Sequence, residues 1–267
     1  MDITVLKTEK KNYLSFLLEK STVAFANTLR RQAIEEVPTM AIEWVEFRKN
    51  SSAIYDEVLA HRLGLIPLKT DLKSYNLPSE CPCKGAGCAQ CQLKLTLKSK
   101  GPATVYASEI ESSDPKVVPA YPKMPIAKLL KGQVLEAEMT AVLGQGKDHT
   151  KWSPGLVYYK YKPTIKISKK GESCLECAKI CPQEVFDKKG DKLTINEKNL
   201  LNCHLCGACE DVSNGEVSVE KNVTDFVFYV ESWGQLSAED IMINASKKFD
   251  RKLDDFTEEF KKTKGEK

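Results

Sequence analysis

The amino-acid sequence predicts an α+β protein with two or three domains. The chain has 267 residues, which is more than one small domain usually contains. Segments with the alternating pattern of strands are interspersed with segments that have the apolar spacing of helices. Residues 168–222 differ in composition, because they are rich in Cys, Lys and Glu and favour only short elements. We interpret this segment as an inserted domain.

Periodicity places the individual elements along the chain. Strands are expected at residues 3–18, 41–47, 93–97, 104–108, 134–143, 155–167 and 226–230, and helices at residues 21–37, 56–65 and 237–260. Ser21 or Thr22 can cap the first helix, and Pro38 ends it. Ser237 and Asp240 begin the last helix in the manner of a capping box, although Asp reaches back less well than Glu.

The last helix carries one continuous apolar stripe. Its members step by three or four residues, which keeps them on one face: Ile241, Ala245, Phe249, Leu253, Phe256 and Phe260. The stripe can pack on the chain's own core or form a surface for a partner helix. Both interpretations stay open at this point.

Charge and hydropathy limit the partners of the chain. Lys and Arg number 40 and Asp and Glu number 37, so the net charge is only +3. A protein that grips nucleic acid by itself usually has a basic excess, so nucleic acid is not expected to be the main partner. The N-terminus lacks a signal pattern, and no apolar run is long enough to span a bilayer. We therefore expect a soluble, cytoplasmic protein.

The ten cysteines fall into three tight groups, a pattern that indicates metal in a reducing compartment. The first group lies in a segment rich in Pro and Gly, which we call the cysteine loop, and consists of Cys81, Cys83, Cys88 and Cys91. Four thiolates can close a tetrahedral shell around Zn²⁺. The alternative is that these cysteines are free thiols without a metal.

The other two groups follow the spacing of iron–sulfur ligands. Cys174-x2-Cys177-x3-Cys181-Pro182 and Cys203-x2-Cys206-x2-Cys209 resemble a two-cluster bacterial ferredoxin, in which the fourth Cys of each motif binds the other cluster. The x3 spacing and the proline favour this interpretation over two zinc ribbons.

Alignment to the ferredoxin pattern predicts one cluster, bound by Cys181, Cys203, Cys206 and Cys209. The second cluster would need cysteines at the positions of Gly171 and Ser213. Cys174 and Cys177 are then spare thiols, which can pair on oxidation. The cluster is expected as [4Fe–4S], with a [3Fe–4S] form as the alternative.

No residue pattern predicts catalysis. Phosphoryl transfer needs clustered carboxylates that hold Mg²⁺, and Asp254-Asp255 falls instead on the charged side of the last helix. The segment Gly144-Gln145-Gly146-Lys147 lacks the spacing of a phosphate-binding loop. We therefore expect no catalytic residues in this chain.

Four segments together resemble one protein family. They are Asn27–Arg31, Asp56–Leu68, Gly144–Pro154 and Glu231–Gly234. The set resembles the N-terminal region of the bacterial RNA polymerase α subunit, and more closely the third-largest eukaryotic subunit and its archaeal D-type counterpart. The ferredoxin-like insert favours the archaeal branch, and the resemblance covers nearly everything outside residues 168–222.

The resemblance implies a discontinuous architecture. Residues 1–41 and 223–267 would form a dimerisation domain like that of the α subunit, residues 42–167 a mostly-β domain that contains the cysteine loop, and residues 168–222 the ferredoxin-like α+β domain. The dimer interface would include Ala26, Leu29, Arg30, Ala33, Ile241, Ala245, Phe249, Leu253 and Phe256. Arg30 and Arg31 would fix an interface, and residues 144–147 would form a turn that contacts a larger subunit.

The function implied is that of a non-catalytic assembly subunit of a DNA-directed RNA polymerase. It would pair with the small α-like partner of the L type, and the pair would seed assembly of the large subunits, alongside small zinc-binding subunits and with little or no direct DNA contact. The alternative is an electron-transfer ferredoxin fused to an unrelated domain. What surrounds the clusters discriminates between the two, because most of the chain matches polymerase elements.

Overall fold

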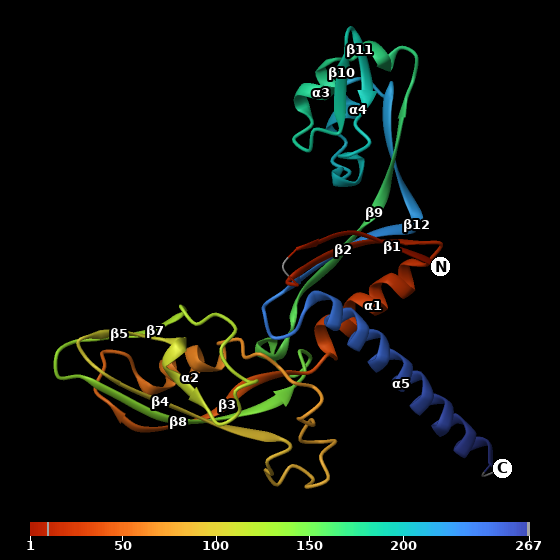
Figure 1. Ribbon diagram of the computed structural model, residues 1–267. Helices are drawn as coiled ribbons and strands as arrows, with labels where there is room; N and C mark the ends of the chain where they lie inside the picture. Colours follow the sequence, from red (N-terminus) through yellow and green to blue (C-terminus); the bar gives the residue numbers. More distant parts are fainter. Residues whose placement is uncertain (10, 266–267) are drawn as a thin grey trace. The chain divides into compact units, whose positions relative to one another are not determined.

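The computed structural model describes residues 1–9 and 11–265 and confirms the α+β class (Figure 1). The chain divides into two compact units, each assembled from separate segments. Unit 1 comprises residues 1–7, 15–28 and 158–229, and unit 2 comprises residues 8–14, 29–157 and 230–267. No helix among the described residues has the length and apolarity needed to cross a membrane.

Unit 1 is built on a four-stranded sheet. The strands lie in the order β1 (Asp2–Glu9), β2 (Tyr13–Glu19), β12 (Val217–Ser232) and β9 (Gly155–Ile167). Aromatic side chains join the strands, since Phe16 stacks on Phe228 at 4.9 Å between ring centroids and Tyr159 packs on the same ring at 5.2 Å. Strand β12 begins nine residues earlier than the expected strand at 226–230, because backbone pairing with β9 extends it through a polar stretch.

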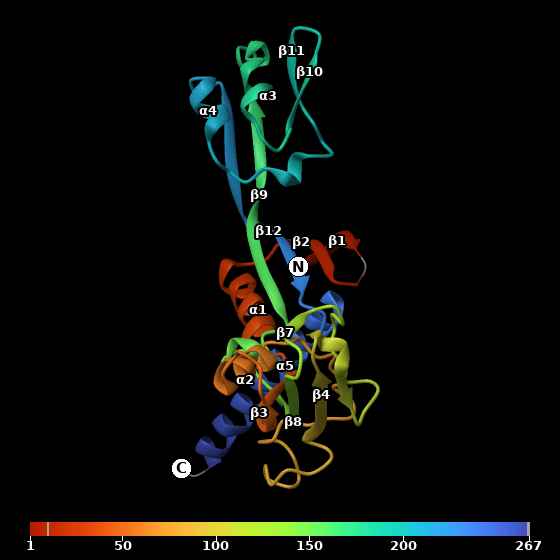
Figure 2. The same cartoon turned by 90° about the vertical axis from the view of Figure 1, so that its left-hand side faces the viewer.

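The short elements of residues 168–222 form a small lobe within unit 1. They are α3 (Glu176–Ile180), β10 (Phe186–Lys189), β11 (Lys192–Ile195) and α4 (Ala208–Val212), and β10 and β11 form an antiparallel hairpin. In both views they lie together beside the ends of β9 and β12 that are farthest from β1 and β2 (Figures 1 and 2). The core of the lobe is small and includes two thiols. Its buried residues are Cys177, Val185, Phe186, Leu193, Cys209 and Val217.

Unit 2 contains a second four-stranded sheet, in the order β3 (Thr39–Asn50), β8 (Val134–Gly144), β4 (Gln92–Lys100) and β6 (Ile110–Ser112). A separate pair joins β5 (Ala103–Tyr106) to β7 (Pro125–Leu129). Strand β4 alternates as the sequence predicts, with its leucines buried and its lysines exposed. Helix α2 (Asp56–Gly64) buries Leu59 and Leu63 in the same core.

The two long helices begin at the expected caps. Helix α1 (Val23–Glu35) follows Thr22, whose Oγ1 accepts a hydrogen bond from the Phe25 backbone N–H at 3.2 Å. Helix α5 (Ala238–Gly265) follows Ser237, whose Oγ accepts from the Asp240 N–H at 3.1 Å. The Asp240 carboxylate accepts from the Ser237 hydroxyl at 2.6 Å, so the short Asp side chain binds the cap side chain.

Candidate metal centres and contact surfaces

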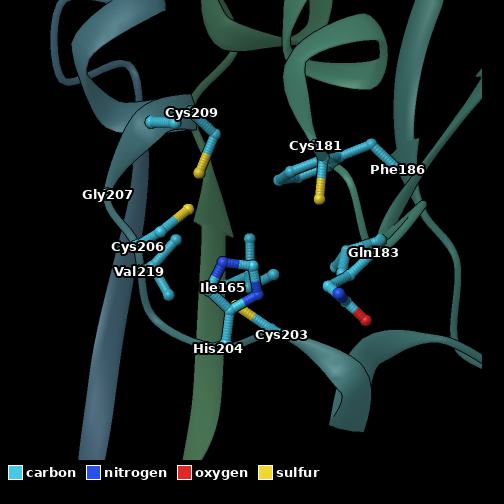
Figure 3. Close-up of a pocket in the computed structure, with 12 residues that line it drawn as sticks. Ile165, Cys181, Gln183, Phe186, Cys203, His204, Cys206, Gly207, Cys209 and Val219 are labelled. Carbon is cyan, nitrogen blue, oxygen red and sulfur yellow. The ribbon is translucent and has the colours of Figure 1, made fainter.

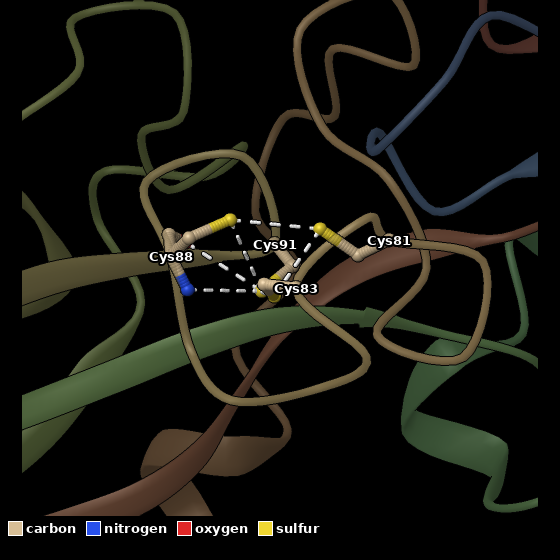
Figure 4. Close-up of side chains that lie close together, drawn as sticks. All are labelled: Cys81, Cys83, Cys88 and Cys91. Carbon is tan, nitrogen blue, oxygen red and sulfur yellow. Dashed lines mark hydrogen bonds between the residues drawn. The ribbon is translucent and has the colours of Figure 1, made fainter.

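The four thiols of the cysteine loop converge on one point immediately before β4 (Figure 4). The sulfur of Cys81 lies 3.5 Å from that of Cys88 and 3.4 Å from that of Cys83, and the sulfur of Cys91 lies 3.5 Å from that of Cys83. All four sulfurs lie within 4.8 Å of one another. Cys81 and Cys91 are buried, so the arrangement is closed and compatible with a metal site.

The local backbone explains this convergence. Gly85 and Gly87 have φ values of +81° and +91°, which residues with a Cβ rarely adopt. The Cys88 N–H donates a hydrogen bond to the Cys91 sulfur at 3.3 Å, and such a bond stabilises the thiolate form.

The pKa of the Cys83 thiol is lowered to about 6, chiefly by its hydrogen bond with Cys81. The backbone N–H of Cys83 lowers the pKa of Cys81, but burial and the hydrogen bonds with the other thiols outweigh it and raise this pKa to about 12. Burial also raises the pKa of Cys91. Metals bind the thiolate form, so a bound metal would have to deprotonate these two thiols.

In unit 1, Cys181, Cys203, Cys206 and Cys209 line one pocket, together with Gln183, His204 and apolar side chains (Figure 3). The cavity among these side chains has a volume of about 20 Å³. Within the described residues, the cysteine loop is the one group whose ligand atoms are close enough to hold a single ion. The four pocket cysteines do not form such a group.

The surroundings of these thiols are mostly apolar. Ile165, Phe186 and Val219 line the pocket, and burial raises the pKa of the Cys209 thiol to about 11. Burial likewise raises the pKa of Cys203. A bound metal reverses such shifts by deprotonating the thiol. Gly207 supports the turn before Cys209, because its φ of +78° lets the chain reverse beside the pocket and begin α4.

The positions where a second cluster would need cysteines have other structural roles. A Cβ at Gly171 would lie 2.6 Å from the backbone oxygen of Glu216, so no side chain fits there without a shift. Ser213 is buried and its Oγ accepts from the Val217 N–H at 2.9 Å. The remaining thiols, Cys174 and Cys177, place their sulfurs 3.2 Å apart.

Lys160, a residue of β9, contacts Cys203 from outside residues 168–222 and was not predicted from the sequence. Its Nζ donates to the backbone oxygen of Cys203 at 2.9 Å and lies 5.4 Å from the centre of the Tyr229 ring. Burial lowers the pKa of its ammonium group. No spacing rule identifies such a residue, because the contact joins positions 43 apart in the chain.

The turn at residues 144–147 also has a role that sequence reasoning missed. Gln145 donates to the backbone oxygen of Glu36 at 2.8 Å, and the Lys147 N–H donates to that of Glu35 at 3.1 Å, so the turn caps the C-terminal end of α1. A Cβ at Gly146 would lie 2.1 Å from the Ile34 backbone oxygen, so only glycine fits at this position without a shift of the backbone.

The Glu36 side chain lies at the centre of this contact. It is 7% exposed and pairs with Lys147 at 3.1 Å and with Lys252 of α5 at 2.6 Å. Burial by itself would raise the pKa of Glu36, but the hydrogen bonds from Lys252 and Lys147 outweigh burial, and the pKa is lowered.

The expected interface residues differ in how far the single chain buries them. Five are buried within the single chain: Ala26, Leu29, Ala33, Ile241 and Ala245. Arg30 and Phe249 are half-buried, whereas Leu253 and Phe256 are 49% and 68% exposed. Phe260 continues the exposed part, and its ring stacks on Phe256 at 6.2 Å. The N-terminal part of the stripe thus packs inside the chain, and the C-terminal part is on the surface.

Three of the four segments that carry the family resemblance meet at one apolar pocket in unit 2. Its wall is formed by Leu65, Pro67, Tyr121, Met124, Thr150, Lys151, Trp233 and Gln235. Leu65 and Trp233 are exposed at this pocket. Gln235 is 4% exposed, and among the described residues its Oε1 has no hydrogen-bond partner. Buried acceptors usually have a partner, so this pocket has the character of a contact surface.

Comparison with known proteins agrees with these features. Residues 45–155 match the model of the RNA polymerase Rpb3/RpoA insert domain. Proteins named DNA-directed RNA polymerase subunit Rpo3 match over most of their length. The protein from Methanosarcina acetivorans is 40% identical, over 92% of this chain and 93% of that protein. The proteins from Archaeoglobus fulgidus and Pyrococcus horikoshii are each 37% identical, over 91% and 98% of this chain and 92% and 99% of their own. The chain belongs to the Rpo3 family of archaeal DNA-directed RNA polymerase subunits.

Proposed function

We propose that this chain is the non-catalytic assembly subunit of its RNA polymerase and that it pairs with the small α-like partner of the L type. The observation that carries the pairing is the exposed end of the α5 stripe, formed by Leu253, Phe256 and Phe260. Apolar side chains that gather on one helical face in water are typical of a partner surface. Co-expression of the two subunits tests the pairing, with stoichiometric co-elution as the expected result and separate elution as the contrary one.

Contact with a large polymerase subunit is proposed at the apolar pocket of unit 2. The wall has three exposed apolar side chains, Leu65, Tyr121 and Trp233. Together with the Gln235 Oε1, which has no partner among the described residues, they support a docked side chain that has an apolar body and an N–H or O–H group. We propose small zinc-binding subunits of the polymerase as further partners and expect little or no direct contact with DNA. We also propose that the protein is located in the cytoplasm. The alternative, an electron-transfer ferredoxin on an unrelated domain, finds no support, because the relatives match this chain almost end to end.

Zinc is the metal proposed for the cysteine loop. The closed set of four sulfurs and the buried positions of Cys81 and Cys91 are features of structural zinc sites, which leave no open coordination position. The metal would supply no chemistry there and would hold the loop against the start of β4. Metal analysis of the purified chain tests this proposal.

One iron–sulfur cluster is proposed in the pocket of unit 1, held by Cys181, Cys203, Cys206 and Cys209 and with [4Fe–4S] as the expected form. The apolar wall and the shared pocket support the ligand set. The backbone contact at Gly171 and the hydrogen bonds of Ser213 support a single cluster, because both positions would have to be rebuilt to bind a second one. When bound, the cluster supplies a one-electron couple and a covalent link between α3 and α4.

The domain boundaries 1–41 with 223–267, 42–167 and 168–222 remain our proposal for the three structural parts. The match of residues 45–155 to the insert-domain model supports the middle part. The core of the lobe supports the third part, because it is made from side chains between Cys177 and Val217.

A further inference from the structure

We propose that Lys160 is a positioning residue that sets the reduction potential of the iron–sulfur cluster, because its charge, held at the carbonyl oxygen of Cys203, favours the more negative reduced form. The inference rests on the proposed cluster and goes beyond it. Lys160 belongs to β9 and lies outside the ferredoxin-like segment, so the strand that carries the lobe also carries this charge.

The contact is specific. The Lys160 ammonium donates to the Cys203 backbone oxygen at 2.9 Å, and the Tyr229 ring lies 5.4 Å from the same nitrogen. The side chain is half-buried, and within the described part of the chain no carboxylate forms an ion pair with it. A cation that is shielded from solvent and not neutralised by a carboxylate acts on nearby charges with little screening.

The charge balance gives the direction of the effect. Four thiolates and a [4Fe–4S]²⁺ core carry a net charge of about −2, and uptake of one electron from an external reductant makes it about −3. No bond forms or breaks in this step. A fixed positive charge stabilises the −3 state more than the −2 state, so Lys160 raises the potential, since the net charge and hydrogen bonds around a cluster set its potential.

The other two lysines of β9, Lys162 and Lys166, differ from Lys160 because each forms an ion pair with a carboxylate. Lys162 is neutralised by Glu19 at 2.8 Å and lies 3.7 Å from Asp225. Lys166 pairs with Glu220 at 2.7 Å, and its side chain is 61% exposed. Solvent and the partner screen the Lys166 charge, so this residue offers a matched control on the same strand.

The test is a redox titration of the full-length chain after anaerobic purification, followed by the electron paramagnetic resonance signal of the reduced cluster. Lys160→Gln keeps an N–H donor and removes the charge, Lys160→Arg keeps the charge, and Lys166→Gln is the control. Lys160→Gln should make one-electron reduction roughly three- to tenfold less favourable, which corresponds to a potential about 30 to 60 mV lower. Lys160→Arg and Lys166→Gln should stay close to the wild-type potential.

Each outcome separates this inference from the proposed cluster. A Lys160→Gln variant with full iron content and the wild-type potential would overturn the inference alone. Absence of iron from the wild-type protein would overturn the cluster and the inference together. Because loss of the contact can also loosen the Cys203 loop, iron content is measured for Lys160→Gln and for Lys160→Met. If both neutral variants lose iron while Lys160→Arg retains it, Lys160 holds the loop and the tuning role is wrong.

Discussion

The Glu36 contact gives the most quantitative prediction of stability. Changing Glu36 to Gln preserves the shape of the side chain but removes the carboxylate that pairs with Lys147 and Lys252. A hydrogen bond to a charged group contributes about 1.5 to 3 kcal/mol. The two lysine side chains are 45% and 46% exposed, so water replaces part of the loss. We therefore expect a smaller loss of unfolding free energy, about 1 to 2 kcal/mol.

The loss should depend on pH. The lowered pKa of Glu36 means that its contribution is complete above the ordinary glutamate pKa of about 4.3 and is lost as the pH falls through the lowered value. The difference between wild type and Glu36→Gln should be constant near neutral pH and shrink below about pH 4.

Thermal and urea unfolding at several pH values measure this difference. At neutral pH the melting temperature should fall by about 2 to 8 °C. Glu35→Gln is the matched control, because Glu35 makes an exposed i,i+4 pair with Arg31 that is worth at most about 0.5 kcal/mol. A Glu36→Gln loss no larger than that of the control, or one that persists unchanged at pH 3, would show that the Glu36 carboxylate does not stabilise the fold through its two lysines.

Three further predictions concern the partner surface and the metals. Phe256→Asp should abolish co-elution with the small α-like subunit without unfolding the chain, because Phe256 is exposed. Ile243→Asp changes an exposed residue of the same helix outside the stripe and should leave pairing intact. Pairing that survives Phe256→Asp but is lost in Ile243→Asp would contradict the interface. Cys203→Ser should lose iron and destabilise the lobe, whereas Cys174→Ser should keep about four irons per chain; about eight irons in the wild type would show two clusters. Cys88→Ser should lose about one zinc per chain while iron is unchanged, and zinc at wild-type level would exclude the cysteine loop as its site.

Most secondary structure could be predicted because local rules decide it. The alternation of leucines in β4, the caps Thr22 and Ser237, and the strand at residues 155–167 all follow from periodicity or from one side chain. The length of β12 could not be predicted. Residues Glu220 to Asn222 are polar and give no strand signal, and β9 supplies the pairing that makes them extended.

In the candidate sites, too, contacts between residues close in sequence could be predicted, whereas contacts between distant residues could not. Cysteine spacing predicted the cysteine loop, because its ligands are close in sequence. Lys160 and Glu36 were missed, because their partners lie 43 and more than 100 residues away. The α5 stripe has one uninterrupted pattern, yet Ala245 is buried and Phe256 is exposed, since periodicity shows a face but not what covers it.

The most direct test of the account is isolation of the chain from native cells at low ionic strength, with every bound protein identified and quantified. For an assembly subunit of RNA polymerase we expect stoichiometric recovery of the large polymerase subunits and the small α-like subunit, with polymerase activity in the same fraction. Recovery of the chain alone, or with redox enzymes and no polymerase subunit, would contradict it.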